Sequence, residues 1–170
     1  MSVRWVTVLA GVLSGVVVWA GMERLPAWPP LRDAYPGLVF GLFLFALCGW
    51  TALASTRARL VALGVSLVAS VASWRLAVSL FAHWPALPFV LSGALGGAVV
   101  GAGCAALWRS RALQVTASLT AAGLLGGVVF QLLDPWLHTF GEHVWSLGLL
   151  IEWQTLVLVT ATWLRDRAPR

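Results

Sequence analysis

Residues 89–111 read FVLSGALGGAVVGAGCAALWRSR. The first part of this stretch, residues 89–108, contains no charged side chain, and Arg109 and Arg111 follow it directly. A helix of about 20 apolar residues crosses the roughly 30 Å hydrocarbon core of a bilayer, and basic residues commonly flank such a span. The stretch therefore predicts a transmembrane helix.

Five further apolar stretches of similar length occupy the rest of the chain. Of its 170 residues, 60% are hydrophobic and 10% are charged, whereas about a quarter are charged in an average soluble domain. Each stretch is continuous, while a membrane strand would show only about ten residues of alternating polarity. We therefore expect an all-α integral membrane bundle of six transmembrane helices in three hairpins, forming one polytopic domain over residues 1–170. The expected helices are 3–22, 37–55, 60–82, 89–108, 113–133 and 144–164.

The cationic side chains are eleven arginines, and they favour one side of the expected bundle. Only Arg24 and Arg32 fall in loops on the opposite side. Basic residues in short loops remain cytoplasmic, so we expect both termini in the cytoplasm and the protein in the plasma membrane. The net charge of +5 is spread over span ends without a continuous basic face, so nucleic acid is not an expected partner. The arginines on the first side are Arg4, Arg57, Arg59, Arg109, Arg111, Arg165, Arg167 and Arg170.

The first span has an alternative interpretation as a signal peptide. Arg4 would be its charged region, and Val18, Trp19 and Ala20 would form a tolerable cleavage pattern. Its apolar run is long enough to cross the bilayer, and its removal would leave an odd number of helices. A retained helix is therefore favoured.

The three expected hairpins are similar in length. An internal repeat is therefore an alternative to three independent hairpins.

Small residues recur four positions apart in the expected spans, most densely at Gly93, Gly97 and Gly101. Such a face lets two helix backbones approach closely, which matters because lipid supplies no hydrophobic drive between helices. We favour tight packing within one bundle over a docking face for another membrane subunit. The same spacing occurs at Gly11 and Gly15, Gly37 and Gly41, Ser66 and Ser70, and Gly123 and Gly127.

Arg75 and Glu152 are ionisable residues deep inside expected spans. From their distance to the outer span ends, both should lie roughly 10 to 12 Å below the outer boundary. Charges at such depth usually face a partner or a water-filled cavity. We expect them to pair across the bundle, with Gln131 and Gln154 as further hydrogen-bond partners. The pair could lock two helices or hold a polar ligand, and snorkelling without pairing is the third interpretation.

The expected outer loops contain a second polar cluster, which consists of His83, Asp134, His138, Glu142 and His143. If His138 begins a helical turn, Glu142 follows at i+4 on the same face, and imidazole with carboxylate suits zinc or another transition metal. The spacing matches no zinc signature, so solvated side chains are favoured and no cofactor is predicted. An outer metal or haem site is the alternative.

Tryptophan and proline occur together in the expected outer loops, around Trp28, Trp84 and Trp136. An indole favours the membrane boundary because its ring is apolar and its N–H finds water or headgroup oxygen. We interpret these residues as interfacial anchors, with an aromatic mouth that faces a ligand as the alternative.

In size, helix count and cytoplasmic termini, the chain resembles the membrane-embedded substrate-binding subunits of energy-coupling-factor vitamin transporters. The resemblance is one of architecture, and no ligand-binding motif of that family is present, so no residue role is carried over. We predict a non-enzymatic membrane protein that binds or passes a small solute together with a partner subunit or a second copy. The alternatives are a structural or assembly subunit, and a membrane enzyme or redox subunit that uses the outer histidines.

Overall fold

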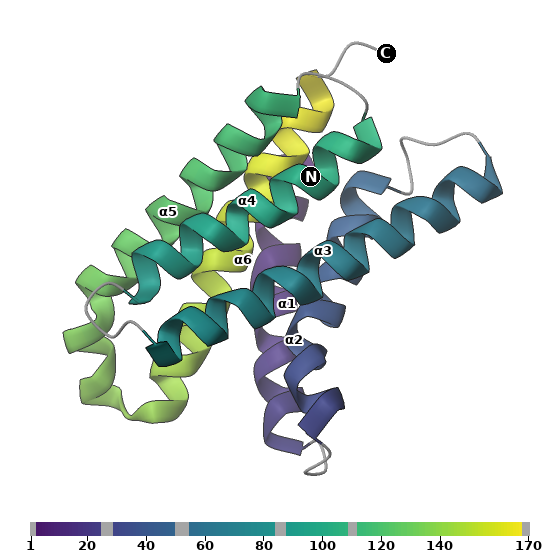
Figure 1. Cartoon of the computed structure of the whole chain (residues 1–170). Coiled ribbons are helices and arrows are strands. Elements are labelled where there is room, and N and C mark those ends of the chain that lie inside the picture. Colours follow the sequence, from purple (N-terminus) through teal and green to yellow (C-terminus); the bar gives the residue numbers. More distant parts are fainter. Residues whose placement is uncertain (1–2, 25–28, 50–54, 84–87, 109–111, 168–170) are drawn as a thin grey trace.

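The computed structural model describes residues 3–24, 29–49, 55–83, 88–108 and 112–167. These residues are almost entirely helical and include no strand (Figure 1). Six helices of the described chain are long and apolar enough to cross a membrane, which confirms the predicted all-α, multi-pass fold. They are α1 (Val3–Arg24), α2 (Pro29–Leu44), α3 (Thr56–His83), α4 (Pro88–Trp108), α5 (Ala112–Leu137) and α6 (Glu142–Arg167). A π-helix, η1 (Phe45–Gly49), follows α2, and a 3-10 turn, η2 (His138–Phe140), follows α5.

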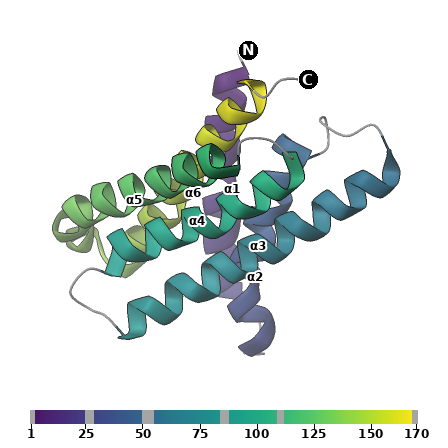
Figure 2. The ribbon, with the colours of Figure 1, turned by 45° about the horizontal axis from the view of Figure 1, so that its top comes forward.

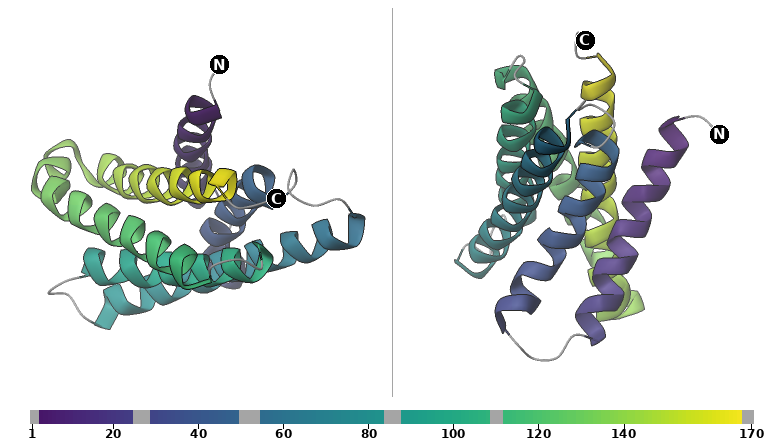
Figure 3. Two further views of the ribbon diagram at one scale, coloured as in Figure 1. Left: turned by 90° about the horizontal axis from the view of Figure 1, so that it is seen from above. Right: turned by 90° about the vertical axis from the view of Figure 1, so that its right-hand side faces the viewer.

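The helices form a ring in chain order. Each one packs against the next, and α6 packs against α1. Figure 3 shows α6 between α5 and α1. Neighbouring helices run in opposite directions, so the start of α1 and the end of α6 lie at the same end of the molecule (Figure 2). Because α6 also contacts α2 and α4, it borders the middle of the ring.

The closest helix pair is α4 with α5, and glycine makes this approach possible. A Cβ atom on Gly93 would collide with the carbonyl oxygen of Gly123, and one on Gly97 would collide with that of Leu119. One on Gly101 would lie 2.8 Å from the α-carbon of Thr116. The small-residue face predicted on α4 is therefore occupied by α5 within the same chain, as expected for packing without side-chain bulk.

Glycines also bring together two other helix pairs that are joined by predicted small-residue faces. Gly11 and Gly15 of α1 lie against α6, where a Cβ on Gly15 would be 2.8 Å from the α-carbon of Ile151. Gly37 and Gly41 of α2 lie against the α3 backbone. These contacts set the register between the helices. If one helix slid along the other, a larger side chain would replace the glycine at the point of close approach.

The second helix is longer than the hydropathy pattern indicates, since it begins at Pro29 rather than at residue 37. Pro36 lies inside it, and transmembrane helices tolerate proline because neighbours satisfy the freed backbone groups. The added turns are attached to α1, where the Tyr35 hydroxyl donates a hydrogen bond of 3.0 Å to the carbonyl of Val17. Asp33 is consequently part of a helix rather than of a loop.

The third helix also starts before its apolar run. It begins at Thr56 rather than at residue 60, because Ser55 caps it: the Ala58 N–H donates to the Ser55 hydroxyl oxygen at 3.2 Å. A serine side chain at this position satisfies an N–H that would otherwise lack a partner.

Between α5 and α6 the chain turns sharply at Gly141, whose φ is 95°. Glycine adopts this left-handed conformation without a steric penalty. His138 therefore belongs to the 3-10 turn while Glu142 starts a new helix. The condition for an i, i+4 pair of His138 and Glu142, a single helical turn that carries both residues, is therefore not met.

The apolar core is packed most extensively toward the end of the ring where α6 finishes. There, Leu119, Val157 and Leu158 are fully buried. Large apolar side chains also point outward from the ring, including Leu60, Val68, Leu113 and Leu132, as expected for helices that face lipid. A smaller cluster around Phe89, Phe130 and Leu137 lies at the opposite end.

Candidate ligand cavity

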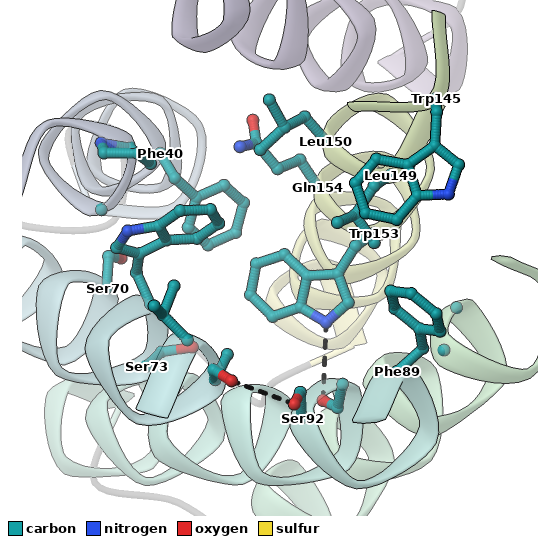
Figure 4. A pocket seen from close by; sticks show the side chains of 18 residues that line it. Phe40, Ser70, Ser73, Phe89, Ser92, Trp145, Leu149, Leu150, Trp153 and Gln154 are labelled. Carbon is teal, nitrogen blue, oxygen red and sulfur yellow. Dashed lines mark hydrogen bonds between the residues drawn. The ribbon is translucent and has the colours of Figure 1, made fainter. Parts of the chain in front are cut away.

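A cavity of about 230 Å³ lies inside the ring, bordered by α2, α3, α4, α5 and α6 (Figure 4). Its lining comes from the later part of α3 and from the first parts of α4 and α6. The cavity is therefore in the half of the bundle that lies away from the start of α1 and the end of α6.

Aromatic side chains form much of the cavity wall, and they are Phe40, Trp74, Phe89, Trp145 and Trp153. The rings of Phe40 and Trp153 are 5.2 Å apart, and those of Phe89 and Trp145 are 6.0 Å apart. These separations are typical of favourable tilted and edge-to-face contacts. The wall thus contains rings from four helices, and four of the five rings form two contacting pairs.

Trp153 projects from α6 toward α4, as Figure 4 shows. A Cβ atom on Gly96 would lie 2.9 Å from its indole ring, so the absent side chain makes room for the ring. The indole N–H points at the carbonyl oxygen of Gly93 across 3.5 Å. This is a long and weak hydrogen bond.

Three buried polar side chains face the same cavity without a hydrogen-bond partner. Ser70, Ser73 and Gln154 are 2%, 1% and 3% exposed. Within the described part of the chain, the two serine hydroxyl oxygens and Gln154 Oε1 accept or donate no hydrogen bond. Ser92 differs, because its hydroxyl donates to the Ala77 carbonyl at 3.1 Å. An unpartnered buried polar atom costs about 1 to 3 kcal/mol, so these three atoms are available to a hydrogen-bonding molecule in the cavity.

Other buried polar atoms of the described residues also lack a partner. Ser14 and Thr155, on the two helices that pack at Gly11 and Gly15, are examples. They do not border the cavity, whereas Ser70, Ser73 and Gln154 do. The cavity also has no ionisable side chain among its described lining residues. It is a neutral, aromatic space with a few hydrogen-bonding groups.

The predicted pair of Arg75 with Glu152 is not formed. Arg75 Nη2 instead lies 3.9 Å from Asp33 Oδ2, and both side chains are more than half exposed. The register of α2 on α3 explains this partner, because Gly37 packs against Val71. Asp33 lies one turn before Gly37 and Arg75 one turn after Val71, so the two residues come level on antiparallel helices. The hydropathy pattern missed the pair because it left Asp33 in a loop.

Glu152 lies on another face of α6, outside the cavity lining. Its neighbours at i−4 and i+4, Gly148 and Leu156, both contact α5. Glu152 Oε1 and Gln131 Oε1 are each buried without a hydrogen-bond partner in the described chain. Of the four residues predicted for this polar site, Gln154 lines the cavity, whereas Arg75, Gln131 and Glu152 do not.

Part of the outer polar cluster does come together, around Trp145. The indole N–H of Trp145 donates to Asp134 Oδ1 at 2.5 Å. His138 Nε2 is 3.5 Å from the same oxygen, and the His138 ring stacks on the Trp145 indole at 5.2 Å. Asp134 and His138 therefore hold one wall of the cavity in position.

The remaining members of that cluster lie apart from it. Glu142 is exposed at the start of α6, and His143 is exposed with its ring 6.3 Å from that of Trp19. The side chain of His83 lies outside the described residues. Across the described chain, no three His, Cys, Asp or Glu side chains gather closely enough to hold a metal ion.

The predicted interfacial tryptophans are only partly described. Trp28 and Trp84 lie outside the described residues. Trp136 is 60% exposed and packs edge-on against Phe140 at 4.8 Å. It does not line the cavity, whereas Trp74, Trp145 and Trp153 do.

The sequence contained two signals for the cavity. Ser66, Ser70 and Ser73 lie on one face of α3. The backbone at Ser66 and Ser70 packs against Gly41 and Gly37 of α2, whereas Ser73 lies beyond these two contacts. Trp74 and Trp153 lie inside their spans rather than at the ends, where anchoring of an indole at the boundary does not apply. Neither signal shows that the serines and the tryptophans border the same cavity.

The fold and the cavity define a multi-pass helical membrane protein with an internal aromatic pocket. Comparison of the chain with protein-family models, with curated proteins and with solved structures finds no match. Function is therefore inferred from the geometry of this chain.

Proposed function

We propose that this protein is an integral membrane binding protein that takes a small solute into the cavity between α2, α3, α4, α5 and α6. The observation that carries the proposal is the set of unpartnered polar atoms on Ser70, Ser73 and Gln154 within an aromatic wall. Small-molecule sites typically combine mostly apolar and aromatic walls with a few polar groups that fix orientation.

The volume of the cavity limits the solute to a small molecule. An apolar cavity of about 150 Å³ accommodates benzene, and this cavity measures about 230 Å³. A compound with one or two rings fits this space, whereas a peptide or a lipid chain with its headgroup exceeds it.

The distribution of arginine supports access from outside the cell. Arg57 and Arg59 at the start of α3, and Arg165 and Arg167 at the end of α6, lie at the end away from the cavity. By the positive-inside rule that end is cytoplasmic. The protein then resides in the plasma membrane with both termini inside, and the cavity lies in the outer half of the bilayer.

Passage of the solute across the bilayer requires a partner. The core around Leu119, Val157 and Leu158 is packed between the cavity and the arginine-rich end, so the solute cannot continue inward without rearrangement of the helices. A partner subunit or a second copy of the chain would drive that rearrangement, and transport is then the role of the assembly.

Native mass spectrometry of the protein extracted from its own membrane tests the binding function. Ala77 lines the cavity on α3, and Ala72 is exposed on the same helix. Ala77→Leu should displace a small bound mass that wild type and Ala72→Leu retain, since both variants add the same atoms but only one adds them to the cavity. Wild-type protein that carries a stoichiometric protein partner and no small mass would instead assign the chain to an assembly role.

A further inference from the structure

We infer that the solute is an uncharged, planar, aromatic compound of the amide or lactam type, with a hydrogen-bond donor and acceptor at its edge. The inference rests on the proposed binding function and names the class of ligand for the same cavity.

The absence of charge follows from the lining. None of the described lining residues is ionisable, and the Asp134 carboxylate of the outer cluster already accepts the N–H of Trp145, a lining residue. Moving an ion from water into such surroundings is very costly unless a counter-charge meets it. A carboxylate or phosphate on the solute would find no such partner.

The aromatic wall favours a flat ring system. Rings from α2, α3, α4 and α6 face the cavity, and aromatic pairs gain energy beyond the area that they bury. Such a wall also attracts quaternary ammonium groups through cation–π contacts. An ammonium of that kind has no donor or acceptor, however, so it would leave the atoms on Ser70, Ser73 and Gln154 unpartnered.

The polar atoms require a solute that both donates and accepts hydrogen bonds. Ser70 and Ser73 lie on the α3 side of the cavity, and Gln154 projects from α6 (Figure 4). Gln154 Oε1 needs a donor, whereas each serine hydroxyl can donate or accept. An amide or lactam supplies both functions in one planar group. It therefore satisfies atoms on two helices at once.

The serine hydroxyls make a distinctive prediction for the unliganded protein. Because neither hydroxyl has a partner among the described residues, replacing both by alanine removes no hydrogen bond from the described fold. The double variant Ser70→Ala/Ser73→Ala should unfold at the same temperature as wild type or higher, while its affinity for the solute falls. If the hydroxyls had a structural role instead, the double variant would unfold at a lower temperature than wild type and its affinity for the solute would not fall.

Calorimetric titration of purified protein with four single-ring probes tests the class: benzamide, toluene, benzoate and benzyltrimethylammonium. Benzamide should bind at least about tenfold more tightly than each of the others, the equivalent of one well-made hydrogen bond. Ser70→Ala/Ser73→Ala should reduce its affinity about tenfold and leave that of toluene unchanged. Ser66→Ala, a buried serine of α3 outside the cavity, is the matched control and should have no effect.

Three outcomes would overturn the inference. Equal affinity for toluene and benzamide would show that the polar atoms do not select the solute, and tighter binding of benzoate or benzyltrimethylammonium would show a charged ligand. If no probe binds while native mass spectra still show a small mass that Ala77→Leu removes, the class is wrong and the binding function stands. If no probe binds and that mass is also absent, the ligand class and the binding function are both wrong.

Discussion

Trp145 connects the cavity to the polar end of the bundle. Its ring lines the cavity, and its N–H donates to Asp134, whose other neighbour is His138. The Asp134 side chain is mostly shielded, with 30% exposure. A hydrogen bond to a charged acceptor contributes more to stability than one between neutral groups.

We expect Asp134→Ala to lower the free energy of unfolding by about 1 to 2 kcal/mol, because the indole N–H loses its acceptor. Thermal unfolding in detergent measures the change. Glu142→Ala removes an exposed acid at the same end of the bundle and should change stability little. Equal losses in the two variants would mean that the Trp145 contact contributes nothing specific.

The contact between Arg75 and Asp33 offers a test of the register of α2 on α3. Its partner Asp33 is exposed, and exposed ion pairs contribute under about 1 kcal/mol. In double-mutant cycles, Arg75→Ala with Asp33→Ala should show a small coupling energy, whereas Arg75→Ala with Glu152→Ala should be additive. Measurable coupling between Arg75 and Glu152 would restore the cross-bundle pair and contradict the geometry.

Glycine acts differently on different helices. Gly97 lies against the Leu119 carbonyl of α5, while Gly64 on α3 has no neighbouring atom within 4 Å of an added Cβ. The same substitution therefore has opposite expected effects at the two positions. The difference comes from the packed face of α4 rather than from glycine itself.

Gly97→Ala should destabilise the protein by about 1 to 3 kcal/mol, since α4 and α5 must separate to admit the methyl group. Gly64→Ala should stabilise it by up to about 1 kcal/mol, because alanine favours helix more than glycine does. Thermal unfolding of the two variants beside wild type provides the comparison. A loss at both positions would indicate that α3 also packs at Gly64.

The whole molecule is a ring with its cavity displaced toward one end, whereas Arg57, Arg59, Arg165 and Arg167 lie toward the other. Its orientation in the membrane is a prediction from charge. Ser55, just before α3, and Thr139, between α5 and α6, are exposed at opposite ends. They suit single-cysteine labelling because the native Cys48 and Cys104 are buried.

A membrane-impermeant maleimide applied to intact cells should label Thr139→Cys and leave Ser55→Cys unlabelled. Opening the cells should expose Ser55→Cys. This result is expected because cytoplasmic loops retain the excess of arginine. The reverse pattern would place the cavity in the inner half of the bilayer and would make the solute cytoplasmic.

Several features of this protein follow from the sequence alone. Runs of about 20 apolar residues can satisfy their backbone in lipid only as helices. The small-residue faces at Gly93, Gly97 and Gly101 indicated close packing, because such faces provide the contact that lipid does not drive. These properties are local, so they can be read along one helix at a time.

The tertiary structure decided which residues meet. Arg75 pairs with Asp33 because Gly37 sets the register of α2 on α3. The cavity exists because the ring leaves space between aromatic and polar side chains of five helices. Among them is Gln154, which was predicted as a hydrogen-bond partner of Arg75 and Glu152 in an ion pair or a ligand site. A pattern along one helix specifies a face, whereas a cavity depends on the rotation and register of all its neighbours.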